Sequence, residues 1–210
     1  MKKRKIGIMG GTFNPIHNGH IALAQAAYEF CELDEVWFMP SGVSYLKKND
    51  KIASGQERFE MTSLAVEDIS YFACSDLEIR RSGNTYTVDT LRFLSQMYPE
   101  DEFFFIMGAD SLLGLLKWRE PRAIAELCTL VSVVRDDVDV QDLIVQKQVL
   151  EERFGARVVL VPFEKKEVSS SLIREKIRGG ESVEELLPGK VLKYIKNHGL
   201  YEEGWMEWKL

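Results

Sequence analysis

The chain has 210 residues, of which 45% are hydrophobic and 29% charged, and its formal net charge at pH 7 is -6. This composition is typical of a globular domain and excludes a disordered or fibrous chain. The negative charge argues against a general nucleic-acid binder, which needs a basic face to displace counterions from phosphates. Because no apolar stretch approaches the length of a membrane span, we expect neither a nucleic acid nor a membrane as partner.

The cysteines and the N-terminus point to the cytoplasm. Cys31, Cys74 and Cys128 are scattered and have no C-x-x-C spacing, which favours neither a disulfide framework nor a zinc site. The apolar part of the N-terminal run MKKRKIGIMGG is too short for the core of a signal peptide. We therefore expect a cytoplasmic protein without a metal site built from its own side chains.

Strand and helix patterns alternate along the chain. Short apolar runs predict strands, at residues 6–9, 36–39, 71–76, 103–107, 130–134 and 158–161. Apolar residues at helical spacing predict helices between them, at residues 21–30, 54–67, from about 87, after 110 and near 142–154. Such alternation implies right-handed crossovers. We expect one α/β domain over residues 1–210, a Rossmann-like, doubly wound and mostly parallel sheet with helices on both faces, and a helical C-terminal part from about residue 168.

The loop after the first strand reads GGTFNPIHNGH, residues 10–20. Gly10 and Gly11 allow backbone amides to approach an anion, and the following helix presents free N–H groups and a positive dipole end. His17 and His20 can donate hydrogen bonds to phosphate oxygens, and Gly19 leaves room for them. A glycine turn with a capping residue explains G-G-T-F alone, but the complete run favours phosphate binding. Because neither G-x-x-x-x-G-K-[ST] nor G-x-G-x-x-G is present, the pattern indicates nucleotidyl transfer.

A second polar motif, VSSSLIREKI, begins at residue 168. It places Ser169, Ser170 and Ser171 at the start of a predicted helix and Arg174 one turn later. Hydroxyls, helix-terminal amides and a guanidinium can together hold phosphate oxygens. Helix capping by serine and an exposed arginine explain the motif equally well on its own, and its coexistence with H-x-G-H favours phosphate binding.

These two motifs together resemble the nucleotidyltransferase α/β-phosphodiesterase superfamily, and more closely its bacterial nicotinate-nucleotide adenylyltransferase family. Further segments carry the resemblance across nearly the whole chain: NTYTVDTL at 84–91, GADSLLGLLKW at 108–118 and VLKYIKNHGLY at 191–201. The resemblance implies transfer of AMP from ATP to nicotinate mononucleotide, giving deamido-NAD and pyrophosphate. It also implies direct attack without a covalent enzyme intermediate, and Mg²⁺ bound mainly through the ATP phosphates.

The resemblance also implies roles for individual residues. The catalytic residues would be His17, His20, Lys47 and Arg174. ATP would be bound by Gly10, Gly11, Thr12, Phe13, His17, His20, Gly108, Asp110, Ser170, Ser171 and Arg174. The acceptor would be bound by Lys47, Thr87 and Trp118. Asp110 would accept hydrogen bonds from a ribose or else cap the following helix, and Trp118 would stack on the pyridine ring or else pack in the core.

The chain departs from the family pattern in two loops. The family usually has P-P-H-K after the second strand, where this chain reads VSYLKK, so Lys48 is an alternative to Lys47. After the fifth strand, R-P-G is replaced by Arg135 followed by Asp136 and Asp137.

Other functions remain open at this point. An adenylyltransferase for nicotinamide mononucleotide differs only in the acceptor's amide, and a phosphopantetheine adenylyltransferase shares the two phosphate motifs. A nucleotide-binding regulator without catalysis would need an altered phosphate site. The sequence also leaves open a homo-oligomer.

Overall fold

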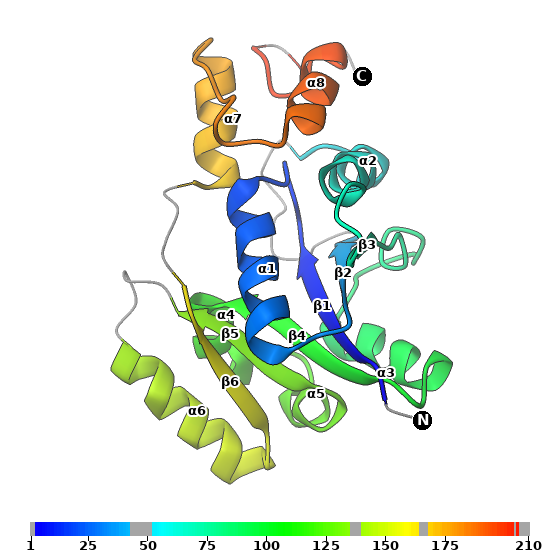
Figure 1. Cartoon of the computed structure of the whole chain (residues 1–210), viewed down its shortest axis with the longest axis vertical. Coiled ribbons are helices and arrows are strands. Elements are labelled where there is room, and N and C mark those ends of the chain that lie inside the picture. The colour runs from blue at the N-terminus through cyan, green and yellow to red at the C-terminus, as the bar shows by residue number, and fades with distance from the viewer. Residues whose placement is uncertain (1–2, 43–51, 135–139, 164–167, 204, 206–210) are drawn as a thin grey trace.

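The core of the molecule is a six-stranded parallel sheet (Figure 1). This computed structural model describes residues 3–42, 52–134, 140–163, 168–203 and 205. The strands are β1 (Lys5–Gly11), β2 (Glu35–Pro40), β3 (Phe72–Cys74), β4 (Glu102–Gly108), β5 (Thr129–Val134) and β6 (Arg157–Pro162). Their order is β3-β2-β1-β4-β5-β6, which reverses direction between β1 and β4 as in doubly wound folds. The predicted α/β class is confirmed, and every strand pair is parallel.

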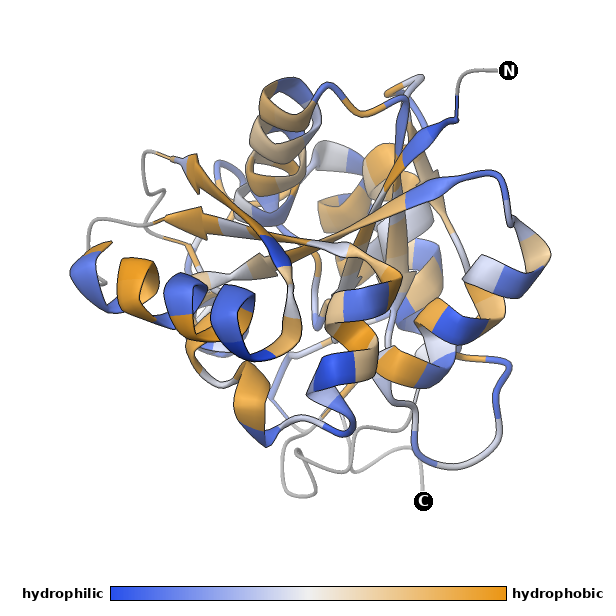
Figure 2. Ribbon diagram, turned by 90° about the horizontal axis from the view of Figure 1, so that it is seen from below, coloured by the Kyte–Doolittle hydropathy of each residue, from blue (hydrophilic) through white to orange (hydrophobic). Residues whose placement is uncertain are grey.

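Helices cover both faces of the sheet (Figure 1). They are α1 (Asn18–Cys31), α2 (Gly55–Val66), α3 (Thr87–Met97), α4 (Ala109–Leu113), α5 (Pro121–Leu127), α6 (Val140–Phe154), α7 (Ser170–Arg178) and α8 (Gly189–Asn197). Buried side chains of α1 and α2 pack on one face, in a cluster that α7 and α8 extend beyond the end of the sheet, and those of α3 to α6 pack on the other face (Figure 1). Figure 2 shows the apolar strands between helices whose polar residues lie mainly on the outside.

Burial on both faces explains the apolar strands. Along β4, Phe103, Phe105 and Met107 belong to the cluster under α3 to α6, whereas Ile106 belongs to the cluster under α1 and α2. A parallel strand covered on both faces is apolar at nearly every position. The run FFFIM is therefore continuous rather than alternating.

The chain differs from prediction after β4. A single leucine-rich helix is expected there, but the structure has the short helix α4, a 3₁₀ turn at Leu115–Lys117 and then α5. Gly114 follows α4 at a position where glycine weakens a helix. Pro121 is the first residue of α5, a position that proline favours. The strand expected at 71–76 is also shorter, since β3 spans three residues.

The structure also gives the state of the cysteines and the length of the helices. Cys31, Cys74 and Cys128 are free thiols. Within the described part of the chain, the helices are too short or too polar to cross a membrane.

Candidate active site

The candidate site lies at the carboxyl ends of β1 and β4, the neighbouring strands at which the strand order reverses. Ligands of open α/β sheets bind at this position. Three adjoining cavities occupy it, with volumes of about 290, 270 and 440 Å³. In that order, we call them the histidine cavity (lined by His17, His20 and Arg174), the strand-end cavity (lined by Gly108 and Asp110) and the threonine cavity (lined by Thr85 and Thr87).

The three cavities share wall residues, and together we call them the cleft. His20 lines both the histidine cavity and the strand-end cavity. Asp110 and Trp118 line both the strand-end cavity and the threonine cavity. Thr12 lies between the histidine cavity and the threonine cavity. The three cavities are therefore neighbours at this edge of the sheet.

The two histidines lie together at the start of α1, where His17 is the N-cap residue. The backbone N–H of His17 donates to Nδ1 of His20 at 3.2 Å, and the two rings stack with centroids 3.7 Å apart. The ring of Phe13 meets His20 edge to face, with centroids 5.0 Å apart. Because Nδ1 of His20 accepts a hydrogen bond, the proton of the neutral ring is on Nε2, which can donate to a ligand oxygen.

Arg174 connects α7 to the loop after β1. One guanidinium nitrogen, Nη1, donates to the backbone carbonyl of Asn14 at 2.8 Å. The other, Nη2, donates to Oγ of Ser171 at 3.3 Å. The arginine therefore reaches back along its own helix, as the sequence predicts, and is also anchored to the loop that carries the histidines.

The three serines at the start of α7 all line the histidine cavity, and the first of them also caps the helix. Ser169 is the N-cap of α7, and its hydroxyl accepts from the N–H of Leu172 at 3.1 Å. The hydroxyl of Ser170 donates to the carbonyl of Pro15 at 2.9 Å. Ser170 and Ser171 line the histidine cavity beside Arg174. Capping thus accounts for Ser169. To donate to a phosphate, the hydroxyl of Ser170 would have to turn away from Pro15, whereas that of Ser171 accepts from Arg174 and keeps its own proton for a ligand.

Close packing explains two glycines of the loop. A Cβ on Gly19 would lie 2.7 Å from Val168 and 3.1 Å from Nδ1 of His17. A Cβ on Gly11 would lie 2.9 Å from the ring of Phe13. Phe13 itself is only 2% exposed, so its ring contacts His20 from the core. Only the backbone of Phe13 could therefore contact ATP.

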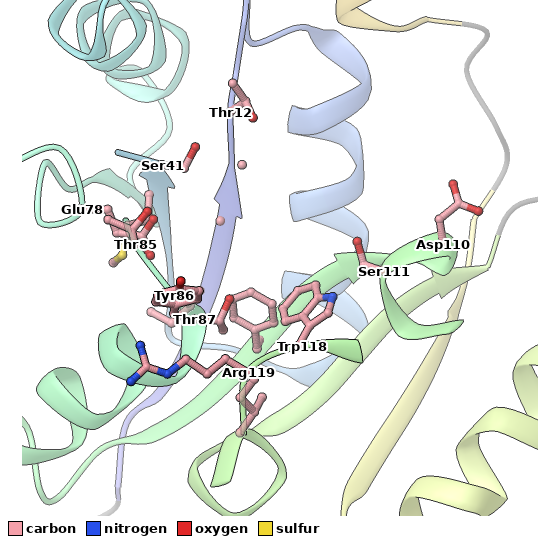
Figure 3. Close-up of a pocket in the computed structure, with 16 residues that line it drawn as sticks. Thr12, Ser41, Glu78, Thr85, Tyr86, Thr87, Asp110, Ser111, Trp118 and Arg119 are labelled. Carbon is pink, nitrogen blue, oxygen red and sulfur yellow. The ribbon is translucent and has the colours of Figure 1, made fainter. Parts of the chain in front are cut away.

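Asp110 is exposed and lines two of the cavities (Figure 3). It is the second residue of α4, whose N-cap is Gly108. The alternative that Asp110 caps this helix is therefore wrong. Its carboxylate is available to accept hydrogen bonds from ligand hydroxyls.

Thr87 and Trp118 come together in the threonine cavity. Thr87 is the first residue of α3, and Trp118 follows the 3₁₀ turn. Figure 3 shows Thr87 and Trp118 on the wall of the same cavity, with Ser111 near Trp118. The indole also meets Phe105 at an interplanar angle of 83°, with centroids 6.0 Å apart. Trp118 thus packs on the core and lines the cleft.

The threonine cavity is lined by both a carboxyl group and a guanidinium, those of Glu78 and Arg119. The carboxylate of Glu78 accepts a hydrogen bond from Oγ1 of Thr90 at 2.7 Å, and burial raises the pKa of Glu78. The guanidinium of Arg119 lies 4.7 Å from the ring centroid of Tyr86 and 3.6 Å from the carboxylate of Asp89. The cavity therefore offers partners for both anionic and polar ligand groups.

Comparisons with known proteins identify the family. Residues 8–176 match the Cytidylyltransferase-like family model. A protein of Lachnoclostridium phytofermentans described as a probable nicotinate-nucleotide adenylyltransferase is 43% identical, with 94% of this chain and 99% of the relative covered. A protein of Dehalococcoides mccartyi with the same description is 42% identical, over 96% of this chain and 98% of the relative. The chain belongs to the nicotinate-nucleotide adenylyltransferase family.

Solved structures of the family support the fold. The Plasmodium falciparum nicotinic acid mononucleotide adenylyltransferase complexed with NaAD superposes with a TM-score of 0.76 at 20% identity, covering 94% of this chain and 97% of that chain. The same enzyme complexed with APC gives a TM-score of 0.74. At this identity the likeness concerns the arrangement of the strands and helices.

The family motifs locate some cavity residues and miss others. Thr85 and Tyr86 lie within NTYTVDTL and Arg119 follows GADSLLGLLKW, so their positions in the sequence could have suggested them. Glu78 lies in the weakly patterned segment before NTYTVDTL, where no motif indicates a site. Arg58 of α2 is also missed, although it is buried behind the loop after β1.

Some predicted residues lie outside the described part of the chain. These are Lys47, its alternative Lys48, and Arg135 with the two aspartates that follow it. The role of Lys47 at the phosphates and the acceptor therefore stays a prediction.

Proposed function

We propose that this chain transfers AMP from ATP to nicotinate mononucleotide, releasing pyrophosphate and deamido-NAD. One observation carries the proposal: a phosphate-type cavity and an aromatic, threonine-lined cavity join in a single cleft through His20, Asp110 and Trp118. Two mononucleotides can lie in this cleft with their phosphates meeting near the histidines. The family to which the chain belongs supports the choice of substrates.

The histidine cavity would hold the phosphates of ATP. Nε2–H of His20 and the guanidinium of Arg174 would donate to phosphate oxygens, and His17 would lie beside them. The hydroxyls of Ser170 and Ser171 would contact the β- and γ-phosphates at the start of α7, where the helix dipole favours anions. These donors are fixed before the reaction, which is how charge at a transferring phosphoryl group is stabilised.

The strand-end cavity would hold the adenosine. Asp110 would accept hydrogen bonds from the ribose hydroxyls, and the lack of a side chain at Gly108 leaves room beside β4. Gly10 lines this cavity as well as the threonine cavity, and Gly11 and Thr12 follow it at the end of β1, where they would approach the ATP from the threonine cavity.

The threonine cavity would hold the pyridine nucleotide. Trp118 would stack on the pyridine ring. The hydroxyl of Thr87 and the amides at the start of α3 would donate hydrogen bonds to the nicotinate carboxylate, since a helix N-terminus favours an anion. Lys47 would contact the phosphate of the acceptor.

The reaction would be a single displacement at the α-phosphorus of ATP. An oxygen of the acceptor's phosphate forms a bond to that phosphorus, the bond to the bridging oxygen of pyrophosphate breaks, and pyrophosphate leaves with its electron pair. No covalent enzyme intermediate is needed, because holding both substrates in line supplies most of the rate enhancement. His17, His20, Lys47 and Arg174 would stabilise the charge that develops on the oxygens.

Mg²⁺ would enter the site with ATP. The side chains around the histidine cavity are mainly imidazoles, hydroxyls and a guanidinium, and Asp110 lies in the adjoining cavity. Across the described residues, His, Cys, Asp and Glu do not gather into a metal-binding group. This set fits an ion held mainly by substrate phosphates and water. Bound there, the ion would neutralise phosphate charge. Chelation by EDTA should abolish turnover, and added MgCl₂ should restore it.

The acceptor is tested by offering three candidates separately. Pyrophosphate release from ATP and Mg²⁺ is measured with nicotinate mononucleotide, nicotinamide mononucleotide and phosphopantetheine, and the products are identified by mass. Strong preference for nicotinate mononucleotide supports the proposal. Preference for either alternative overturns the acceptor, and ATP binding without release from any acceptor favours a nucleotide-binding regulator. The cytoplasmic location expected from the scattered cysteines, which are free thiols, is part of this proposal. Light scattering would show whether the chain forms a homo-oligomer.

A further inference from the structure

Tyr201 ends the closing motif VLKYIKNHGLY, and the proposed function gives it no role. Its side chain is buried, with the residue only 2% exposed. The phenol hydroxyl donates to Oδ1 of Asn14 at 2.9 Å, and the ring packs on Trp205 with centroids 5.1 Å apart. A tyrosine near the C-terminus is therefore bonded to the loop between β1 and α1.

Arg58 approaches the same loop from α2. It is 4% exposed, and its guanidinium donates to three backbone carbonyls. Nε donates to Ala53 at 3.1 Å, Nη1 to Thr12 at 2.8 Å and Nη2 to Ser41 at 2.7 Å. These carbonyls belong to the start of α2, the end of β1 and the end of β2. A planar fork of donors can bridge three segments in this way, whereas a lysine ammonium cannot match the geometry.

The contacts of Tyr201 and Arg58 converge on residues 12–14. Oδ1 of Asn14 also accepts from the N–H of Ala53 at 3.0 Å, so Asn14 is tied to the segment that Arg58 holds. The carbonyl of Asn14 accepts from Nη1 of Arg174 at 2.8 Å. A shift of Asn14 would therefore move the anchor of the arginine that faces the phosphates.

We propose that Tyr201 and Arg58 are positioning residues, which set the backbone of residues 12–14 and, through the carbonyl of Asn14, the guanidinium of Arg174. Neither residue lines the histidine cavity, so both act through the groups they hold. Burying a guanidinium is costly unless its donors are satisfied, and here they are used to fix three loop ends. Small displacements of catalytic groups have large effects on rate.

The sharpest test is Tyr201→Phe, which keeps the ring and removes one hydroxyl. The matched control is Tyr194→Phe, because Tyr194 also lies in the C-terminal part and its hydroxyl donates to Glu60 of α2 at 2.5 Å, away from the cleft. We expect Tyr201→Phe to lower kcat/KM for ATP and to weaken ATP binding by about three- to tenfold, as for the loss of one hydrogen bond. Tyr194→Phe should stay within about twofold of the original chain.

A double-mutant cycle separates positioning from general stability. If Tyr201 acts through Arg174, then Tyr201→Phe should change kcat/KM by less than about twofold in a chain that already carries Arg174→Met. The role of Tyr201 would be overturned if Tyr201→Phe lowered kcat/KM by the same factor with and without Arg174→Met. It would also be overturned if Tyr201→Phe had the same kcat/KM as Tyr194→Phe. For Arg58, Arg58→Lys should be as impaired as Arg58→Met, and recovery in the lysine variant would mean that charge alone suffices.

The inference rests on the proposed function only for its kinetic readout. ATP affinity is measured by calorimetric titration without any acceptor, so it reports on the positioning even if the acceptor is wrong. Loss of ATP affinity in Tyr201→Phe together with no turnover of nicotinate mononucleotide by the original chain would overturn the proposed function and keep the inference. Unchanged ATP affinity in Tyr201→Phe, together with normal turnover of nicotinate mononucleotide by the original chain, would overturn the inference and keep the proposed function.

Discussion

Replacing His20 tests the catalytic role most sharply, because its two ring nitrogens have different functions. Nδ1 accepts the backbone N–H of His17 and so completes the start of α1, while the proposed function gives Nε2–H the role of a donor to phosphate. His20→Ala removes both functions, together with the ring contacts to His17 and Phe13. His20→Gln keeps an acceptor at the third helical position, where glutamine commonly bonds back to the N-cap N–H.

The expected magnitudes differ for the two variants. Loss of a helix cap costs about 1 kcal/mol of unfolding free energy, which lowers Tm by about 2–4 °C for a chain of this size. Loss of one donor to a transferring phosphoryl group lowers kcat by about 10²- to 10³-fold. We therefore expect His20→Ala to lose both stability and turnover, and His20→Gln to lose turnover at nearly unchanged Tm.

The assay is continuous pyrophosphate release at saturating substrates, with Tm measured by circular dichroism on the same samples. Turnover of His20→Ala within about threefold of the original chain would refute the reasoning, because a charge-stabilising donor contributes far more. Full turnover in His20→Gln would also refute it, since the imidazole would then serve only to cap the helix.

Three further predictions follow from the cleft. Trp118→Ala should raise KM for nicotinate mononucleotide by about two- to tenfold with a smaller change for ATP, and Trp118→Phe should retain most of the affinity; equal shifts in both KM values would contradict stacking. Gly42→Ala should lower the free energy of unfolding, measured in urea, by about 1–3 kcal/mol, because the added Cβ would lie 2.4 Å from the carbonyl oxygen of Glu78. Gly189→Ala should leave it unchanged, because no atom lies within 4 Å of the added Cβ. Burial raises the pKa of Glu78 above its ordinary value of 4.5, so its contribution to stability is present below that value and is lost as pH rises through the raised pKa. Glu78→Gln should therefore raise Tm at pH 8 but not at pH 4, and an equal change at both pH values would count against this.

The sheet could be predicted from the sequence because its strands are buried on both faces. Runs such as 103–107 are apolar at every position for that reason, and the turns after them carry glycine or proline. The segment after β4 was harder, because its leucines suit one helix, while Gly114 and Pro121 divide it into α4, a 3₁₀ turn and α5. The pattern of leucines alone does not show this break.

Local motifs predict the residues that line the histidine cavity, whose roles in the reaction stay a prediction. His17, His20 and Arg174 belong to short, recognisable stretches, and the structure brings them to one cavity. Arg58 and Tyr201 could not be found this way, because their partners lie in distant segments and an isolated arginine or tyrosine on a helix or turn has no distinctive pattern. Their contacts depend on how the folded elements meet.

The stereochemical course at phosphorus tests the account most directly. ATP with a single configuration of sulfur at the α-phosphorus is incubated with nicotinate mononucleotide, and the configuration of the thio-dinucleotide product is determined. Direct attack between two substrates in one cleft predicts inversion of configuration. Retention would mean two successive displacements through an adenylyl-enzyme, which would contradict the account.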